Sequence, residues 1–213
     1  MANVKGRNVR IEIATGFGSA IPVTAVTNAN PAVATAASHG LANNVVGYFD
    51  LVTGMEQLNG QAARVKNTAT NTFELQGLNT SNMGVYTGGN FYPASGWTTF
   101  AETTAYTIGG GAGTKLNATR LIDNLTQEEQ GNLAAQTLSM RLLAQTVPST
   151  AGALLDSIAQ ATGKALARVT FADGAVRIAY GEPSMAGEDV AQGALGTGTI
   201  DFTVKGFVLK LAA

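Results

Sequence analysis

The sequence predicts a mostly β protein of the α+β class, with a β-sandwich or barrel-type sheet and one flanking α-helix. Charged residues make up only 13% of the 213 residues, whereas hydrophobic residues make up 45% and glycine alone contributes 26 residues. Short β-branched runs alternate apolar and polar residues, and turn-forming residues separate them. A chain of this length forms one sizeable domain, or a domain with a smaller module inserted into it.

The composition also excludes several classes of function. A formal net charge of −1 leaves no basic excess to neutralise phosphates, so tight nucleic-acid binding is not expected. No run approaches the ~20 apolar residues of a membrane span, and residues 1–6 lack the apolar core of a signal peptide. We therefore expect no membrane insertion and a chain made in the cytoplasm. Because there is no Cys, stability must come from packing and association.

The N-terminal part predicts a first strand and then a small β module. Apolar and charged residues alternate as in a strand with one buried face, namely Val9, Arg10, Ile11, Glu12 and Ile13. From residue 22 to residue 92, short apolar pieces are separated by Asn, Gly, Thr and Ser, which is typical of short strands with frequent turns. We expect an inserted module over residues 22–92 and a discontinuous core domain over residues 1–21 and 93–213.

The middle of the chain predicts a strand, a glycine run and a polar loop. Residues 97–108 are typical of a strand. The glycines of residues 109–113 disfavour regular structure. Residues 114–135 are rich in Asn, Gln, Asp and Glu, and they predict a long polar loop with at most one helical turn.

The C-terminal part predicts strands around one helix. Strict alternation over residues 136–144 predicts a strand. Ser149 is a helix N-cap, and Gly163 is expected to end the helix in a left-handed conformation. The helix presents one apolar stripe: Ala151, Leu154, Leu155, Ile158, Ala161 and Thr162. Asp173 and Gly174 predict a hairpin between strands at 165–171 and 175–180. A glycine-rich acidic connection over 181–198 then precedes a last strand at 199–211.

The order of these elements, from Thr137 to Leu211, resembles the tail tube proteins of long-tailed, non-contractile bacteriophages. The N-terminal strand and the polar loop also have counterparts in that family. The resemblance implies a β-sandwich-like subunit with the helix on its flank. It further implies hexameric rings, an inner barrel built from strands of all subunits, rings stacked through loops, and DNA passing through the lumen. Inner tubes of contractile tails share this architecture.

Residues 22–92 resemble a small β module that recurs in phage virion proteins. Four segments support this resemblance: Asn30-Pro31-Ala32-Val33, Ser38-His39-Gly40-Leu41, Met55-Glu56-Gln57-Leu58-Asn59-Gly60 and Asn71-Thr72-Phe73-Glu74-Leu75. The resemblance implies a decoration or adhesion-like module without catalytic residues. The tail tube family more often has extra domains at its C-terminus, so an insertion after the first strand is a departure from its pattern.

The channel wall and the subunit contacts can be sought among polar residues. A duct for DNA should not bind the polyanion strongly, and the near-neutral charge agrees with this. Candidates for the lumen are Arg10, Glu12, Thr137, Ser139, Arg141, Asp201, Thr203 and Lys205. These residues are equally compatible with the solvated face of a β-sandwich. Candidates for subunit-interface loops are Asp123, Glu128, Glu129, Glu188 and Asp189.

No catalytic, cofactor or metal site is predicted. His39 is the single histidine, and its turn context favours an ordinary loop residue over a catalytic base. Without Cys, and with one His, a zinc site would be poor chemistry. Glu128 and Glu129 are adjacent and do not face one cleft, so they do not form an acid/base pair. We expect no enzyme activity and no cofactor.

The sequence therefore predicts a structural virion protein whose stacked hexameric rings form the tail tube, the conduit for genome delivery. Its partners would be further copies of itself, the tape measure protein, and terminator and tip proteins. It would assemble in the host bacterial cytoplasm and reside in the virion tail. A tail terminator or head decoration protein remains an alternative. A carbohydrate-binding adhesion module is another, based on aromatic residues that could equally pack a small core: Tyr48, Phe49, Tyr86, Phe91, Tyr92 and Trp97.

Overall fold

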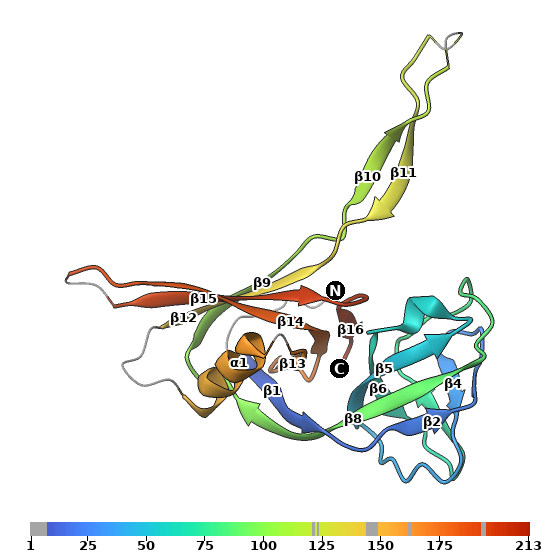
Figure 1. Cartoon of the computed structure of the whole chain (residues 1–213), viewed down its shortest axis with the longest axis horizontal. Helices are drawn as coiled ribbons and strands as arrows, with labels where there is room; N and C mark the ends of the chain where they lie inside the picture. Colours follow the sequence, from blue (N-terminus) through green and yellow to red (C-terminus); the bar gives the residue numbers. More distant parts are fainter. Residues whose placement is uncertain (1–7, 121, 123, 144–148, 162, 193–194) are drawn as a thin grey trace.

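A computed structural model describes residues 8–120, 122, 124–143, 149–161, 163–192 and 195–213. Its dominant feature is one antiparallel sheet that curls into a half-barrel, with a single α-helix among the described residues (Figure 1). The alternating β-branched runs account for this sheet, because each run forms a strand with one apolar face that must be buried. The predicted mostly β fold with one flanking helix is confirmed.

The sheet contains 14 strands, and its path runs from the N-terminal half of the chain to the C-terminal half. In order, the path is β3 (Ala25–Val26), β4 (Ala32–Thr35), β7 (Thr72–Leu75), β6 (Ala62–Lys66), β5 (Val46–Thr53), β8 (Gly88–Thr99), β1 (Arg10–Phe17), β13 (Ala165–Thr170), β14 (Val176–Asp189), β15 (Thr197–Val204), β12 (Thr137–Leu143) and β9 (Thr103–Gly109). Off this path, β2 (Ile21–Val23) pairs with β8, and β16 (Leu209–Leu211) pairs with β14. A 3-10 turn, η1 (Glu56–Leu58), follows β5.

The helix α1 (Thr150–Gln160) forms where the sequence predicts it. The Ser149 hydroxyl accepts a hydrogen bond from the Gly152 amide at 3.1 Å, which satisfies one of the free donors of the first turn. Ala151 and Leu155 are buried against the sheet. Gly163 follows the helix and donates its amide to the Ile158 carbonyl oxygen at 2.8 Å, whereas its left-handed conformation stays a prediction. Glycine is favoured there because a Cβ would lie 3.1 Å from the Ile158 side chain.

Three predicted strands or connections have different bounds in the structure. The strand expected over 97–108 is two strands, because the chain turns between β8 and β9. The strand expected over 199–211 is also interrupted, at a turn where Gly206 has a φ of +68°. The connection expected over 181–198 is largely strand, because β14 continues to Asp189 and pairs with β15 beyond Gly181.

The polar loop expected over 114–135 is instead a β-hairpin, formed by β10 (Gly113–Asn117) and β11 (Glu128–Leu133). These two strands form a sheet of their own. Their sequences lack the alternation of apolar and polar residues that predicts a strand, because these strands do not pack on the core of their own chain. We call this hairpin, with the described residues of its connecting loop, the arm. It extends away from the rest of the molecule (Figure 1).

The buried side chains form three clusters. The first lies between α1 and the strands β1, β12, β13, β14 and β15. The second lies within residues 23–91. The third, which we call the shared cluster, joins the two halves and contains Ala14, Val46, Tyr48, Ala62, Leu166, Val176, Ile178, Tyr180, Leu209 and Leu211. Within it the rings of Tyr48 and Tyr180 stack at 3.9 Å. The division into a core domain and an inserted module stays a prediction.

Candidate functional site

The C-terminal half of the sheet presents a polar face on four consecutive strands, β14, β15, β12 and β9. We call these the four-strand sheet. Register places Thr107, Ser139, Asp201 and Ser184 in one row across it. Gly109, Thr137, Thr203 and Glu182 form the next row, and Ala105, Arg141 and Thr199 a third. Side chains alternate between faces, so the intervening residues, including Leu138, Met140, Ile200 and Phe202, are buried on the other side.

Five of the residues predicted to face a lumen come together on this polar face: Thr137, Ser139, Arg141, Asp201 and Thr203. Lys205 lies just beyond β15, where its ammonium group is 3.1 Å from the Glu182 carboxylate. The charges on this face therefore include both signs. Sequence reasoning missed Thr107, Ser184 and Glu182. The alternation of residues around Thr107 could have predicted its place on this face. Glu182 and Ser184 were missed because Gly181 is typical of a connection rather than a strand.

Arg10 and Glu12 lie elsewhere, on β1, which β13 separates from the four-strand sheet. The Glu12 side chain is only 7% exposed. Its carboxylate accepts hydrogen bonds from Arg168 at 2.7 and 2.9 Å and forms an ion pair with Arg10 at 3.1 Å. The Arg168 guanidinium also lies 4.2 Å from the centre of the Trp97 ring. Burial, and then the charge of Arg168, lower the pKa of Arg64 on β6.

The four-strand sheet has an open edge on each side in the described part of the chain. On one side, β9 pairs only with β12. On the other side, β14 leaves its partners β13 and β16 by Gly181, and its remaining residues pair only with β15. Open edges carry unpaired amide and carbonyl groups that readily add a strand from another chain.

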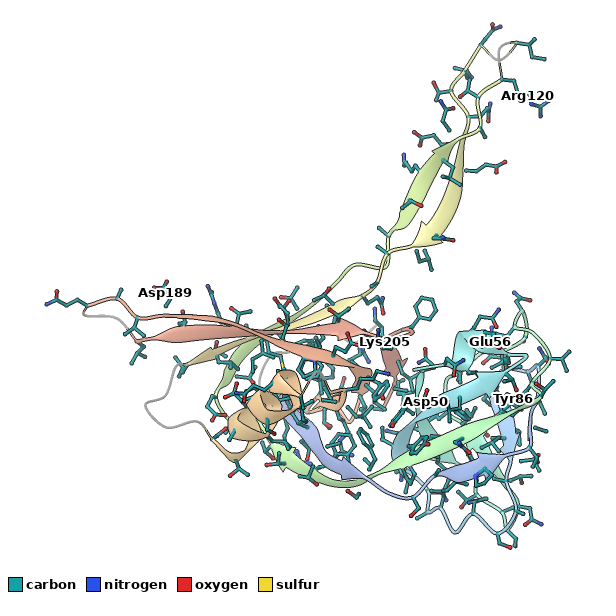
Figure 2. The ribbon with its side chains drawn as sticks, viewed as in Figure 1. Asp50, Glu56, Tyr86, Arg120, Asp189 and Lys205 are labelled. Atoms are coloured by element: carbon teal, nitrogen blue, oxygen red, sulfur yellow. The ribbon has the colours of Figure 1, made fainter. Side chains whose placement is uncertain are left out.

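The arm and the opposite tip of the sheet are also exposed. The arm has four exposed apolar residues: Leu116, Ile122, Leu125 and Leu133. Within it, Lys115 and Glu128 form an ion pair. The β14–β15 tip has exposed Val190 and Leu195, and Leu143 lies beside it. Figure 2 shows Arg120 on the arm and Asp189 at the tip, at opposite extremities of the molecule. A two-stranded hairpin is marginally stable alone, so packing against another surface would stabilise the arm.

The predicted interface residues fall on these two projections. Glu128 and Glu129 are exposed on the arm, and Asp189 is exposed where β14 ends. Glu188 belongs to β14, and its side chain is outside the described part. Asp123 lies outside the described residues altogether. These acidic residues therefore belong to the arm and the tip, and the structure does not bring them together.

The side chain of His39, which was considered as a catalytic base, contacts the backbone through its ring nitrogens. The Nδ1 of His39 accepts a hydrogen bond from the Leu41 amide at 3.0 Å, and its Nε2 lies 3.2 Å from the Thr72 carbonyl oxygen. Both ring nitrogens are thus engaged by the backbone. No group of three or more potential metal ligands occurs in the described ranges. Among those same residues, no helix is long and apolar enough to cross a membrane.

The aromatic residues of the predicted module mostly pack inside it. Phe49 and Phe91 are fully buried and lie 5.2 Å apart, and Tyr48 and Tyr86 are also buried. Tyr92 and Trp97 are partly exposed. Packing therefore accounts for most of the aromatic residues that motivated a glycan-binding alternative.

Open edges on both sides of one sheet, together with two exposed projections, are surfaces suited to association with further chains, as in a structural subunit. The model of the phage tail tube protein family matches residues 53–206. The chain belongs to that family, and the predicted resemblance is confirmed. The match starts at the end of β5, inside the segment predicted as an inserted module, and continues through β15. A comparison with curated proteins found no match.

Proposed function

We propose that this chain forms stacked hexameric rings of the phage tail tube, through which the genome passes to the host. The observation that carries this proposal is the pair of open edges on opposite sides of the four-strand sheet. If β9 of one copy pairs with the free part of β14 in the next, the contact is heterologous. Repetition of such a contact closes into a ring when the rotation permits, and closure removes both edges.

The dimensions of such a barrel suit a DNA duct. Six copies would contribute roughly 24 strands, spaced ~4.8 Å apart and tilted by ~40°. This geometry gives a backbone diameter of about 48 Å. Side chains on the inner face leave a bore of roughly 35–40 Å, which is wide enough for a DNA duplex.

The polar face of the four-strand sheet is the proposed channel wall. Its hydroxyl groups are neutral, Arg141 and Asp201 have opposite charges, and Lys205 is paired with Glu182. Such a wall does not hold a polyanion through a dense array of cations, so DNA can slide. The buried ion network leads us to leave Arg10 and Glu12 out of the proposed wall.

The proposed partners follow from this arrangement. The tape measure protein would occupy the lumen during assembly in the host cytoplasm, and terminator and tip proteins would cap the two ends. A terminator forms one ring and does not polymerise. The exposed apolar residues at both the arm and the tip favour a tube subunit, which contacts further copies on both sides of its ring.

Electron microscopy of the purified protein at increasing concentration tests the proposal. We expect hexameric rings and then tubes. If concentrated protein forms neither, alone or with tail extracts, the proposal is wrong. Because the chain has no Cys, thiol crosslinking can test ring closure directly.

The crosslinking variant combines Thr107→Cys on β9 with Ser184→Cys on β14, both at exposed positions. A short bis-maleimide should give a ladder that ends at the hexamer. Each single-cysteine variant is the matched control and should give no ladder. Rings that contain the double variant but yield no ladder would contradict pairing through these two edges.

A further inference from the structure

The curl of the sheet brings together two arginines from distant strands. β6 contacts β14, although β5, β8, β1 and β13 lie between them along the sheet (Figure 1). Arg64 on β6 lies opposite Val46, and Arg168 on β13 lies opposite Ile178. Val46 and Ile178 both belong to the shared cluster, and residues directly opposite each other point to the same face of a sheet. Both arginines therefore lie on the face that the shared cluster occupies.

Arg64 has no acidic partner in the described part of the chain. None of the ion pairs between described residues includes it. Its Nε donates a hydrogen bond to Gln76 Oε1 at 2.6 Å, and this acceptor belongs to a neutral amide. Arg64 is half-buried, so water screens its charge less than it screens the charge of an exposed lysine. The described chain therefore leaves this cation without a neutralising charge.

The charge of Arg168 adds to the excess of positive charge. Burial, and then the charge of Arg168, lower the pKa of Arg64, which means that the two guanidinium groups are close enough to repel each other. Arg168 pairs with the Glu12 carboxylate, but Arg10 pairs with the same carboxylate. Three arginines therefore share one acidic side chain, and only Arg64 among them has no contact with it.

Aromatic side chains lie beside the arginines. The Arg168 guanidinium is 4.2 Å from the centre of the Trp97 ring. Trp97 and Tyr92 are half-buried and pack against the shared cluster. Partly exposed aromatic rings next to guanidinium groups can contact the carbon skeleton of an organic anion, which a free inorganic ion lacks.

We propose that Arg64 and Arg168 form a binding site for an oxyanion, either the carboxylate of a sugar acid or a phosphate. The planar guanidinium fork matches the oxygen atoms of both groups. An oxyanion between the two arginines would give Arg64 the charged acceptor that it lacks, and it would replace a repulsion by two attractive contacts. The site lies within a single chain, so this inference does not depend on ring formation.

Titration of the unassembled protein with sodium phosphate at constant ionic strength tests the site. Trp97 is the single tryptophan and contacts Arg168, so its emission reports on binding there. We expect a saturating change in emission that sodium chloride at the same ionic strength does not produce. Arg64→Gln should raise the Kd for phosphate about tenfold or more, because it removes charged hydrogen bonds.

Lys210→Gln is the matched control, with the same change of charge. Lys210 is exposed and alternates on β16 with Leu209 and Leu211, which belong to the shared cluster, so it points to the other face. This variant should bind phosphate as the wild type does. If Arg64→Gln does not fold, Arg64→Lys replaces it, because lysine retains the charge but not the planar fork; its Kd should also rise.

Sodium glucuronate provides the second arm of the experiment. A lower Kd for glucuronate than for phosphate identifies the ligand as a sugar acid that also uses the aromatic rings, and a higher Kd identifies it as phosphate. Either result supports the site. Wild-type protein that shows no saturable change with either anion overturns the proposal. Unchanged binding by the folded Arg64 variant, or equal weakening in Lys210→Gln, also overturns it, because the anion would then bind elsewhere or respond only to net charge.

Discussion

Two arginines contact the buried carboxylate of Glu12, and they should contribute unequally to stability. The Arg168 side chain is 21% exposed and makes the contacts at 2.7 and 2.9 Å, whereas the Arg10 side chain is 59% exposed and makes one at 3.1 Å. Removal of one partner from a buried ion pair costs about 3–5 kcal/mol, because the other charge remains buried. An exposed ion pair contributes at most about 1 kcal/mol.

Arg168→Ala should therefore lower the free energy of unfolding by about 3 kcal/mol, at the low end of that range because Arg10 remains and Arg168 is partly exposed. Loss of its contact with the Trp97 ring adds about 0.5–1 kcal/mol. Arg10→Ala, the matched control, should cost less than about 1 kcal/mol. The double variant Glu12→Gln, Arg168→Met removes the buried carboxylate charge together with its main partner. It should recover most of the free energy of unfolding that Arg168→Ala loses.

Urea titration of the unassembled protein measures these differences. Trp97 is the single tryptophan, so its fluorescence reports on the site itself. Arg168→Ala should also change the emission of the folded state, whereas Arg10→Ala should leave it unchanged. Equal losses for the two alanine variants, or a loss below about 1 kcal/mol for Arg168→Ala, would refute a buried structural role for this network.

Three further predictions concern single side chains. Tyr86→Phe should stabilise the fold by about 1 kcal/mol, because the Tyr86 hydroxyl is buried without a hydrogen-bond partner in the described part of the chain. Burial also raises the pKa of Tyr86 to about 12 from 10.0, so wild-type stability is complete below pH 10 and declines toward pH 12. Urea titrations should show a smaller alkaline decline for the variant. Gln61→Ala should cost about 2–4 kcal/mol by calorimetry, since it leaves the Phe207 amide and carbonyl without their partner. Ser149→Ala removes the hydrogen bond to the Gly152 amide and should cost about 1 kcal/mol in the same assay, with Ser149→Thr close to wild type.

The sequence predicted the elements whose apolar residues face the chain's own core. Residues 137–143 show the alternation of a strand with one buried face, so both the strand and the membership of its polar face could be predicted. The arm could not, because β11 has no apolar alternation and, among the described strands, pairs only with β10. The continuation of β14 was missed for a related reason, since its glycines are typical of a connection rather than a strand.

The candidate site shows the same division. Thr137 and Thr203 could be assigned to one face from periodicity alone, and register confirms that they are neighbours. Glu12 fits the same periodicity, but its side chain is buried. Periodicity could not predict this burial, because the partner Arg168 is 156 residues away in the sequence. Alternation identifies the side of a strand on which a residue lies, but it does not reveal what covers that side.

The shared cluster has a consequence for the cooperativity of unfolding. It draws side chains from β5 and β6 as well as from β13, β14 and β16, and its Tyr48–Tyr180 stack spans the two halves. Neither half can melt without exposing apolar surface of the other to water. We therefore expect one calorimetric transition, with equal van't Hoff and calorimetric enthalpies, although the other two clusters share no residues. Residues 22–92 and the C-terminal strands would then unfold together, as a single thermodynamic unit.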